Sequence, residues 1–165
     1  MSATEPTFTG GCQCGVVRFS AQSLGRSSIC HCRMCQKATG SFFGAFVTGR
    51  GVQWTRGAPK HFLSSNKVRR GFCGECGTPL TYEQLEDVPA GQVELAVGAL
   101  DRPAGAPPVI QVGVDDKLPF FDGLAALPVE TERSDAWQHF LDTLVSHQHP
   151  DHDTDTWPPA ESSTP

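Results

Sequence analysis

Short apolar runs, separated by glycine, proline and asparagine, occupy much of the chain up to residue 114. Runs of this length, bounded by turn residues, predict β-strands rather than long helices. The segment 101–108 contains three prolines and a glycine, so we expect a loop there. Strands are expected at residues 16–19, 42–47, 52–54, 61–63, 68–72, 80–82, 93–97 and 109–114.

The apolar pattern changes its period near the end of the chain. Five residues at helical spacing form one apolar stripe, which predicts an amphipathic helix over residues 134–146 with Ser134 or Asp135 as its N-cap. From residue 147 onward polar residues and prolines dominate, so residues 147–165 are expected to be a disordered tail. The residues of the stripe are Trp137, Phe140, Leu141, Leu144 and Val145.

Composition and charge narrow the class of protein. A formal net charge of -5 argues against a nucleic-acid-binding surface, which needs clustered lysine and arginine. Residues 1–10 lack the basic and apolar regions of a signal peptide, and no apolar run approaches the ~20 residues that span a bilayer. We therefore expect a cytoplasmic protein with no nucleic-acid or membrane partner, while the sequence indicates no oligomeric state. Cytosolic thiols stay reduced, so the seven cysteines indicate metal binding or catalysis instead of disulfides.

Four of the cysteines are suited to a closed zinc site. Cys73 and Cys76 enclose one glycine and precede another, which is typical of a zinc knuckle, a tight turn that presents two sulfurs to one ion. Tetrahedral zinc needs four ligands, and a distant pair that ties two remote segments together is the usual complement. Cys12 and Cys14 fit, because one intervening residue on an extended chain puts both side chains on one face. These four cysteines are predicted to hold a structural zinc ion.

The remaining sulfurs, on Cys30, Cys32 and Cys35, form a second cluster. Three protein ligands with a vacant fourth position are typical of a catalytic zinc site, so we predict two zinc ions per chain. His31 is an alternative fourth ligand, although its place between two ligands on an extended segment should point it to the opposite face. Both sites could also be purely structural, with a stray fourth ligand at the second one. Simple packing of reduced cysteines does not explain three tight clusters beside glycines.

The other histidines are expected to have ordinary roles. His61 lies in a predicted strand with no partner ligand nearby in the sequence. His147, His149 and His152 have loose ligand spacing on a polar segment, where solvated side chains are the simpler interpretation.

The three clusters together resemble a known family. The segments GCQCGVVR at 11–18, CHCRMCQK at 30–37 and FCGECGTPL at 72–80 are similar, in order and spacing, to the glutathione-dependent formaldehyde-activating enzyme family, which includes centromere protein V. The similarity spans residues 8–128, which we take as one zinc domain, and includes the segment KLPF at 117–120. It implies a mainly β, zinc-bearing Mss4-like fold of small antiparallel sheets, here followed by one C-terminal helix.

The resemblance also implies an activity. The family's named reaction is carbon–sulfur bond formation, in which glutathione thiolate adds to formaldehyde and gives S-hydroxymethylglutathione. It assigns Cys12, Cys14, Cys73 and Cys76 to the structural zinc and Cys30, Cys32 and Cys35 to the catalytic zinc. A zinc-dependent carbon–sulfur lyase acting on a glutathione adduct of a small aldehyde is therefore the leading interpretation, with glutathione or a similar thiol as partner. Basic side chains that could meet its carboxylates are Arg33, Lys37, Arg69 and Arg70, although for each one alone a solvated surface charge is the favoured interpretation.

Two residues depart from the family pattern, since Gln111 stands where a histidine is expected and Pro119-Phe120 where Pro-Trp is expected. The competing interpretation is a non-catalytic binding module with two structural zinc sites, which would need a fourth protein ligand and no pocket at the second cluster. The enzyme interpretation predicts a pocket there, lined by aromatic residues that could otherwise be core: Phe42, Phe43, Phe46, Trp54 and Phe120.

Overall fold

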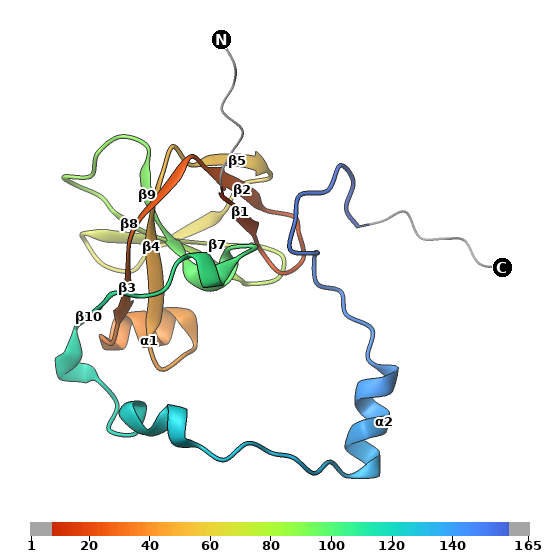
Figure 1. Cartoon of the computed structure of the whole chain (residues 1–165). Coiled ribbons are helices and arrows are strands. Elements are labelled where there is room, and N and C mark those ends of the chain that lie inside the picture. Colours follow the sequence, from red (N-terminus) through yellow and green to blue (C-terminus); the bar gives the residue numbers. More distant parts are fainter. Residues whose placement is uncertain (1–7, 159–165) are drawn as a thin grey trace.

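The computed structural model describes residues 8–158 and arranges them mainly in two β-sheets (Figure 1). The smaller sheet has the order β1-β2-β5, with β1 (Phe8–Gly11), β2 (Arg18–Ala21) and β5 (Gln53–Arg56). The larger sheet has the order β10-β3-β4-β9-β8-β7-β6. Its strands are β3 (Ser23–Cys30), β4 (Gly44–Arg50), β6 (Lys60–Leu63), β7 (Val68–Phe72), β8 (Pro79–Gln84), β9 (Gln92–Ala96) and β10 (Ile110–Val112). The prediction of a mainly β fold is confirmed.

Antiparallel pairing holds throughout the two sheets except at one edge. Strand β10 runs parallel to β3, with Ile110 opposite Ser28 and Val112 opposite Cys30. The long connection between β9 and β10 allows this parallel pairing, which a short hairpin could not. It places Gln111 and Val112 beside the end of β3, where the second cysteine cluster begins.

One hydrophobic cluster joins the two sheets. Phe19 of the small sheet and Leu95 of the large sheet are both fully buried, as is Leu80. Phe19 meets Trp54 edge to face within the small sheet, with ring centroids 5.8 Å apart. Cys12, Cys35 and Cys73 belong to the same cluster, so both groups of cysteines border the core.

A short helix carries part of the second cysteine cluster. Residues for which the sequence pattern predicted no helix form α1 (Arg33–Thr39). The Cys32 sulfur caps its start by accepting from the Cys35 backbone N–H, and Gly40, in the left-handed region with φ 63°, caps its end. Seven residues are too few to show an amphipathic period, which explains why the pattern did not reveal the helix.

Strands β1 and β3 were also missed by the sequence pattern. Two of the four residues of β1 are glycines, and β3 is rich in serine. Pairing holds these residues in strands, since β3 lies between β10 and β4 and β1 pairs with β2 along its length. Tertiary context therefore overrides weak local propensity in both strands.

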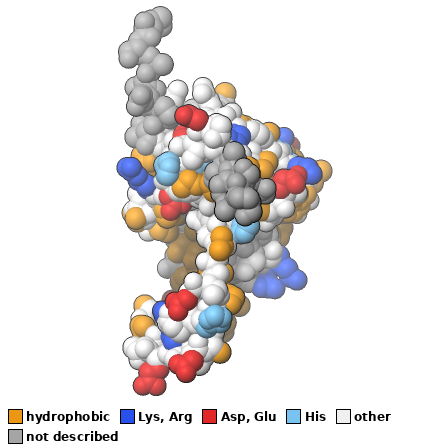
Figure 2. All heavy atoms as spheres, turned by 90° about the vertical axis from the view of Figure 1, so that its right-hand side faces the viewer, with side chains coloured by type: hydrophobic (Ala, Val, Ile, Leu, Met, Phe, Trp, Pro, Cys, Tyr) orange, Lys and Arg blue, Asp and Glu red, His pale blue; other side chains and the backbone are white. Residues whose placement is uncertain are grey.

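The predicted C-terminal helix is confirmed as α2 (Asp135–Thr143), and Ser134 caps it by accepting from the Trp137 backbone N–H at 3.3 Å. Its apolar stripe is largely exposed, with Trp137 and Phe140 each 48% exposed. These two rings stack on each other at 4.9 Å. Figure 1 shows α2 standing apart from the sheets, and Figure 2 shows hydrophobic and acidic side chains together on that part of the surface. Among residues 8–158, no helix is long and apolar enough to cross a membrane.

Short 3-10 helices fill the connections after β9. They are η1 (Val97–Ala99), η2 (Pro103–Gly105), η3 (Val114–Asp116) and η4 (Phe121–Ala126). The segment at η4 packs on the loop that follows α1, where Phe42 meets Phe120 and Phe43 meets Phe121 edge to face. This aromatic contact holds the chain beside the second cysteine cluster before it leaves toward α2.

Residues 148–158, which fall in the segment expected to be a disordered tail, fold back onto the loop between β1 and β2. His149 is only 3% exposed, and its backbone N–H donates to the Gln13 carbonyl at 2.7 Å. The Trp157 indole donates to the Cys14 carbonyl at 2.7 Å and meets the His149 ring edge to face. A polar composition predicted solvation, but one histidine and one tryptophan supply enough specific contacts to dock the segment. Residues 159–165 lie outside the described part of the chain.

Substitution of Trp157 tests this docking. We expect Trp157→Ala to lower the free energy of unfolding by about 1–3 kcal/mol, because it removes a hydrogen bond and an aromatic contact. Trp137→Ala is the matched control, since Trp137 is half exposed on α2, and should change stability by less than about 0.5 kcal/mol. Urea denaturation measures both, and equal effects of the two substitutions would contradict the docked tail.

A buried ion pair links β2 to the segment after η1 and to the tail. Arg18, only 3% exposed, donates to both Asp101 carboxylate oxygens at 2.7 and 2.6 Å and also to Asp153. Burial alone would raise the pKa of Asp101, but hydrogen bonds from Arg18 and Thr9 lower that pKa overall. The fold therefore stabilises the ionised form of the Asp101 carboxyl group.

The lowered pKa of Asp101 predicts acid sensitivity. Its stabilising effect is complete above its unfolded pKa of about 3.9 and is lost as the pH falls through the folded pKa. We expect Asp101→Asn to cost about 3–5 kcal/mol at pH 7, because it leaves a buried guanidinium short of its partner. The difference from wild type should shrink below about pH 4. Asp122→Asn, which removes an exposed partner of Lys117, is the control, and a pH-independent difference for Asp101→Asn would refute the assignment.

Candidate metal centres and active site

The structure brings together the four cysteines predicted to form a closed site. The sulfurs of Cys12, Cys14, Cys73 and Cys76 all lie within 4.8 Å of one another. Cys12 and Cys14 come from the loop after β1, and Cys73 and Cys76 from the turn between β7 and β8. The first pair lies in a turn and not on an extended segment, since the Gly15 N–H donates to the Cys12 carbonyl at 3.1 Å. The pairing was therefore predicted, but the local geometry behind it was not.

Backbone groups support the sulfurs of this four-cysteine cluster. The Val17 N–H donates to the Cys12 sulfur at 3.2 Å, and the Glu75 N–H to the Cys73 sulfur at 3.4 Å. Gly77, with φ +77°, lets the knuckle turn tightly enough for its own N–H to donate to the Cys73 carbonyl at 2.9 Å. The Thr78 hydroxyl accepts from the Gln13 N–H at 3.0 Å and so joins the two loops directly.

The second cluster forms where β3 ends and α1 begins. The sulfurs of Cys30, Cys32 and Cys35 lie within 4.8 Å of one another, with Cys30 and Cys32 3.5 Å apart. Cys30 closes β3, Cys32 is the N-cap of α1, and Cys35 lies in the first turn of that helix. No fourth histidine, cysteine, aspartate or glutamate belongs to this group among residues 8–158.

Both clusters have the spacing that a tetrahedral thiolate site requires. Zinc–sulfur bonds of about 2.3 Å at tetrahedral angles place two sulfurs about 3.8 Å apart. The Cys12–Cys14 and Cys14–Cys73 sulfur pairs are 3.5 and 3.7 Å apart. A disulfide would need about 2.0 Å, and all seven cysteines are free. Each cluster can therefore hold a metal ion.

The pKa values of the thiols differ within each cluster, and these differences also indicate that each cluster can hold a metal ion. Burial raises the pKa of Cys14 to about 12, and burial likewise raises the pKa of Cys30 to about 12. Burial opposes ionisation of Cys76 as well, but hydrogen bonds from Thr78 lower its pKa to about 6. Burial also opposes ionisation of Cys32, but hydrogen bonds from the Cys35 backbone N–H and from the neighbouring thiols together lower its pKa. Crowded thiols of this kind ionise together only when a cation offsets their repulsion.

His31 lies outside the cluster, as its place between two ligands predicted. Its side chain is fully buried, and its Nε2 atom lies 2.8 Å from Oε1 of Gln111. The ring meets Phe121 edge to face, with centroids 4.6 Å apart. Gln111, one of the two departures from the family pattern, thus faces the segment between two cluster cysteines and orients it. His61 has an ordinary role, beside Glu83 at 2.9 Å.

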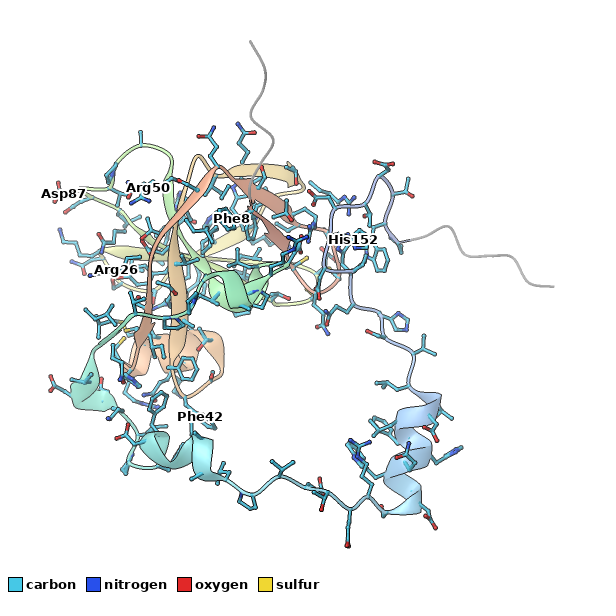
Figure 3. All side chains as sticks on the ribbon, in the orientation of Figure 1. Phe8, Arg26, Phe42, Arg50, Asp87 and His152 are labelled. Carbon is cyan, nitrogen blue, oxygen red and sulfur yellow. The ribbon has the colours of Figure 1, made fainter. Side chains whose placement is uncertain are left out.

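A cavity of about 560 Å³ opens beside the second cluster. All three cluster cysteines border it, and its far wall includes Arg26 and Asp87, which Figure 3 shows on the same side of the molecule. Of the aromatic residues predicted to line a pocket, Phe46 does so. Phe42, Phe43 and Phe120 instead pack in the contact beneath α1, and Trp54 packs on Phe19. Tyr82, which no sequence pattern singled out, is the other aromatic residue at this wall.

The four basic residues named from the sequence have different environments. Arg33 donates to the Gln36 side chain, and Arg69 to Glu83 at 2.7 Å. Lys37 is exposed. Arg70 is only 4% exposed and donates to the Cys35 sulfur at 3.4 Å. Strand alternation separates Arg69 from Arg70, but the local sequence does not show which of the two faces inward.

Metal analysis of single-cysteine variants tests the two centres. We expect two ions per wild-type chain and one fewer in Cys73→Ser and in Cys32→Ser. Cys73→Ser should be the less stable variant, because its cluster joins segments about 60 residues apart in the chain. Elemental analysis with urea denaturation measures both properties. Wild-type protein without bound metal, or equal destabilisation by the two substitutions, would contradict this assignment.

Comparisons with known proteins agree with the geometry. The crystal structure of a Rhodobacter sphaeroides protein matches with a TM-score of 0.50 and 19% identity, over 63% of this chain and 99% of that one. At that identity the match concerns the fold alone. A search of curated proteins gives no match. The family model described as "Glutathione-dependent formaldehyde-activating enzyme" matches residues 7–116, which include all seven cysteines. The chain therefore belongs to the glutathione-dependent formaldehyde-activating enzyme family.

Proposed function

We propose that the protein is a zinc-dependent carbon–sulfur lyase that joins a small thiol such as glutathione to formaldehyde or a related aldehyde. The observation that carries this proposal is the position of Cys30, Cys32 and Cys35 on the wall of the 560 Å³ cavity. Three donors without a fourth among the described residues are typical of a working zinc site, whereas a four-cysteine set is typical of a structural one. On this assignment Cys12, Cys14, Cys73 and Cys76 hold the structural zinc ion.

The cavity has the charges that an amino-acid-containing thiol requires. Arg26 lines the wall and forms no ion pair among residues 8–158. Glu94, on the same wall, accepts a hydrogen bond from Thr48 at 2.6 Å through one carboxylate oxygen and keeps the other for a ligand. Glutathione carries carboxylates that suit Arg26 and an ammonium group that suits Glu94 or Asp87.

The reaction needs a thiolate beside an aldehyde carbon. A zinc ion held by Cys30, Cys32 and Cys35 would keep an incoming thiol ionised near neutral pH. The protein orients the thiol through the charged groups of the cavity and keeps the sulfur close to the aldehyde. The sulfur then forms a bond to the carbonyl carbon, and the proton lost by the thiol ends on the former carbonyl oxygen. The product is S-hydroxymethylglutathione when the substrates are glutathione and formaldehyde.

The alternative function is a non-catalytic binding module with two structural zinc ions. It would require a fourth protein ligand at the second cluster and no cavity beside it. The cavity and the three-member donor set favour the enzyme, and the exposed stripe of α2 leaves room for an additional protein contact.

Turnover of glutathione with formaldehyde tests the enzyme directly. We expect the zinc-loaded protein to accelerate adduct formation over the spontaneous reaction, and Cys32→Ser to return the rate to background while keeping the structural zinc. Exchange NMR of the formaldehyde-derived CH₂ signal measures the rate. Glu75→Gln, on the exposed knuckle away from the cavity, is the control variant. A wild-type rate equal to background would exclude this activity without affecting the metal sites.

A further inference from the structure

Arg70, in the middle of β7, is a buried cation directed at the second cysteine cluster. Its guanidinium donates to the Cys35 sulfur at 3.4 Å and, through Nε, to the Ser64 hydroxyl at 3.0 Å. It also lies over the Tyr82 ring, 5.1 Å from the ring centroid. The residue is only 4% exposed and borders the 560 Å³ cavity. Of these three partners, Ser64 and Tyr82 are neutral, and Cys35 belongs to the sulfur cluster.

A buried guanidinium without a counter-charge strongly destabilises a fold. The group that balances the charge of Arg70 therefore indicates which negative charge the site carries. Arg18, the other buried arginine, has Asp101 and Asp153. Arg70 has no carboxylate partner among residues 8–158, because Glu83 on the neighbouring strand is bound to Arg69 and His61. The group that remains to balance its charge is the trio of Cys30, Cys32 and Cys35.

The charge count makes this pairing specific. Three thiolates around a divalent ion carry a net charge of −1, which one buried arginine neutralises. A fourth ligand that is itself a thiolate would bring an isolated cluster to −2, whereas beside Arg70 the sum goes from zero to only −1. Because electrostatic interactions are strong in a desolvated site, that difference favours anionic ligands at the open position.

We propose that Arg70 is a positioning residue that balances the charge of the three-cysteine cluster and thereby allows it to accept a thiolate as fourth ligand. The inference rests on the proposed function only in requiring a metal ion at this cluster. It concerns the electrostatics of the ligand's sulfur and not recognition of the rest of the ligand. The hydrogen bond to Ser64 and the Tyr82 ring fix the guanidinium in the place where its charge acts on Cys35.

Cobalt replacement makes thiol binding visible without turnover. The full-length chain is loaded with Co²⁺, and the spectrum of Cys32→Ser, which keeps only the four-cysteine cluster, is subtracted. Glutathione and, separately, 2-mercaptoethanol are then titrated while sulfur-to-cobalt charge-transfer absorption is followed. The variants are Arg70→Gln, which removes the charge, Arg70→Lys, which keeps it, and Arg50→Gln, an exposed arginine of β4 that does not border the cavity (Figure 3).

We expect Arg70→Gln to weaken binding of both thiols by about 10–100-fold, the usual effect of losing a group that supports metal ligands. Arg70→Lys should stay within about fivefold of wild type because charge matters more here than the planar shape of the guanidinium. Arg50→Gln should be unchanged. The use of 2-mercaptoethanol separates two roles, since it has no carboxylate for an arginine to bind.

Four results would overturn the proposal. Wild-type affinity for both thiols in Arg70→Gln would show that the charge is irrelevant, and weakening for glutathione alone would make Arg70 a carboxylate-binding residue. If Arg70→Gln does not fold, the thiol affinity of Arg70→Lys is the test. A loss of thiol affinity beyond tenfold in that variant would contradict the charge-balancing role. Cobalt absent from the second cluster of wild-type protein would overturn this inference together with the proposed function. Thiol binding without turnover would contradict the proposed reaction but would not contradict the role of Arg70.

Discussion

Mutual repulsion between crowded sulfurs is the constraint around which this fold is built. Seven cysteines lie in two groups whose sulfurs are within 4.8 Å of one another, and several of them border the hydrophobic core. Fully ionised, such groups would drive their segments apart, and fully protonated they would offer only weak contacts. Each cluster can hold a cation, which would turn the repulsion into attraction. The loop after β1, the turn after β7 and the start of α1 then become fixed points of the structure.

The two clusters differ in the groups that surround their sulfurs. This difference supports a structural role for the four-cysteine cluster and a ligand-binding role for the three-cysteine cluster. The four-cysteine cluster joins two loops that are also connected by the hydrogen bond between Gln13 and Thr78, and its sulfurs are contacted by backbone N–H groups and by the Thr78 hydroxyl. The three-cysteine cluster is built on one continuous segment, and what completes its electrostatics is a side chain from another strand, Arg70. A site assembled in this way keeps room for an outside ligand, and the cavity lies on that side.

The cysteine spacing alone predicted both clusters, because ligand sets depend on local turns that glycine and short spacings reveal. Most strands were predicted as well, with boundaries displaced by a few residues. What the sequence could not show depends on contacts between distant segments. Arg69 and Arg70 are indistinguishable until the elements around β7 are placed. Strand β8 then gives Arg69 the carboxylate of Glu83, and α1 gives Arg70 the sulfur of Cys35. The prediction of the aromatic pocket wall was wrong for the same reason, because Phe42 and Phe120 pack against each other and do not line the cavity.

The docked tail extends this reasoning to the C-terminal part of the chain. Its backbone and indole contacts fall on Gln13 and Cys14, within the loop that supplies half of the four-cysteine cluster. Ordering of this loop and docking of the tail are therefore linked equilibria. A change that orders the loop favours docking, and docking favours the ordered loop to the same extent. Helix α2 lies in the chain between the aromatic pairs at η4 and this docked segment, and its apolar stripe is largely exposed. The loop that carries Cys12 and Cys14, and not the amphipathic helix, anchors the C-terminal segment to the fold.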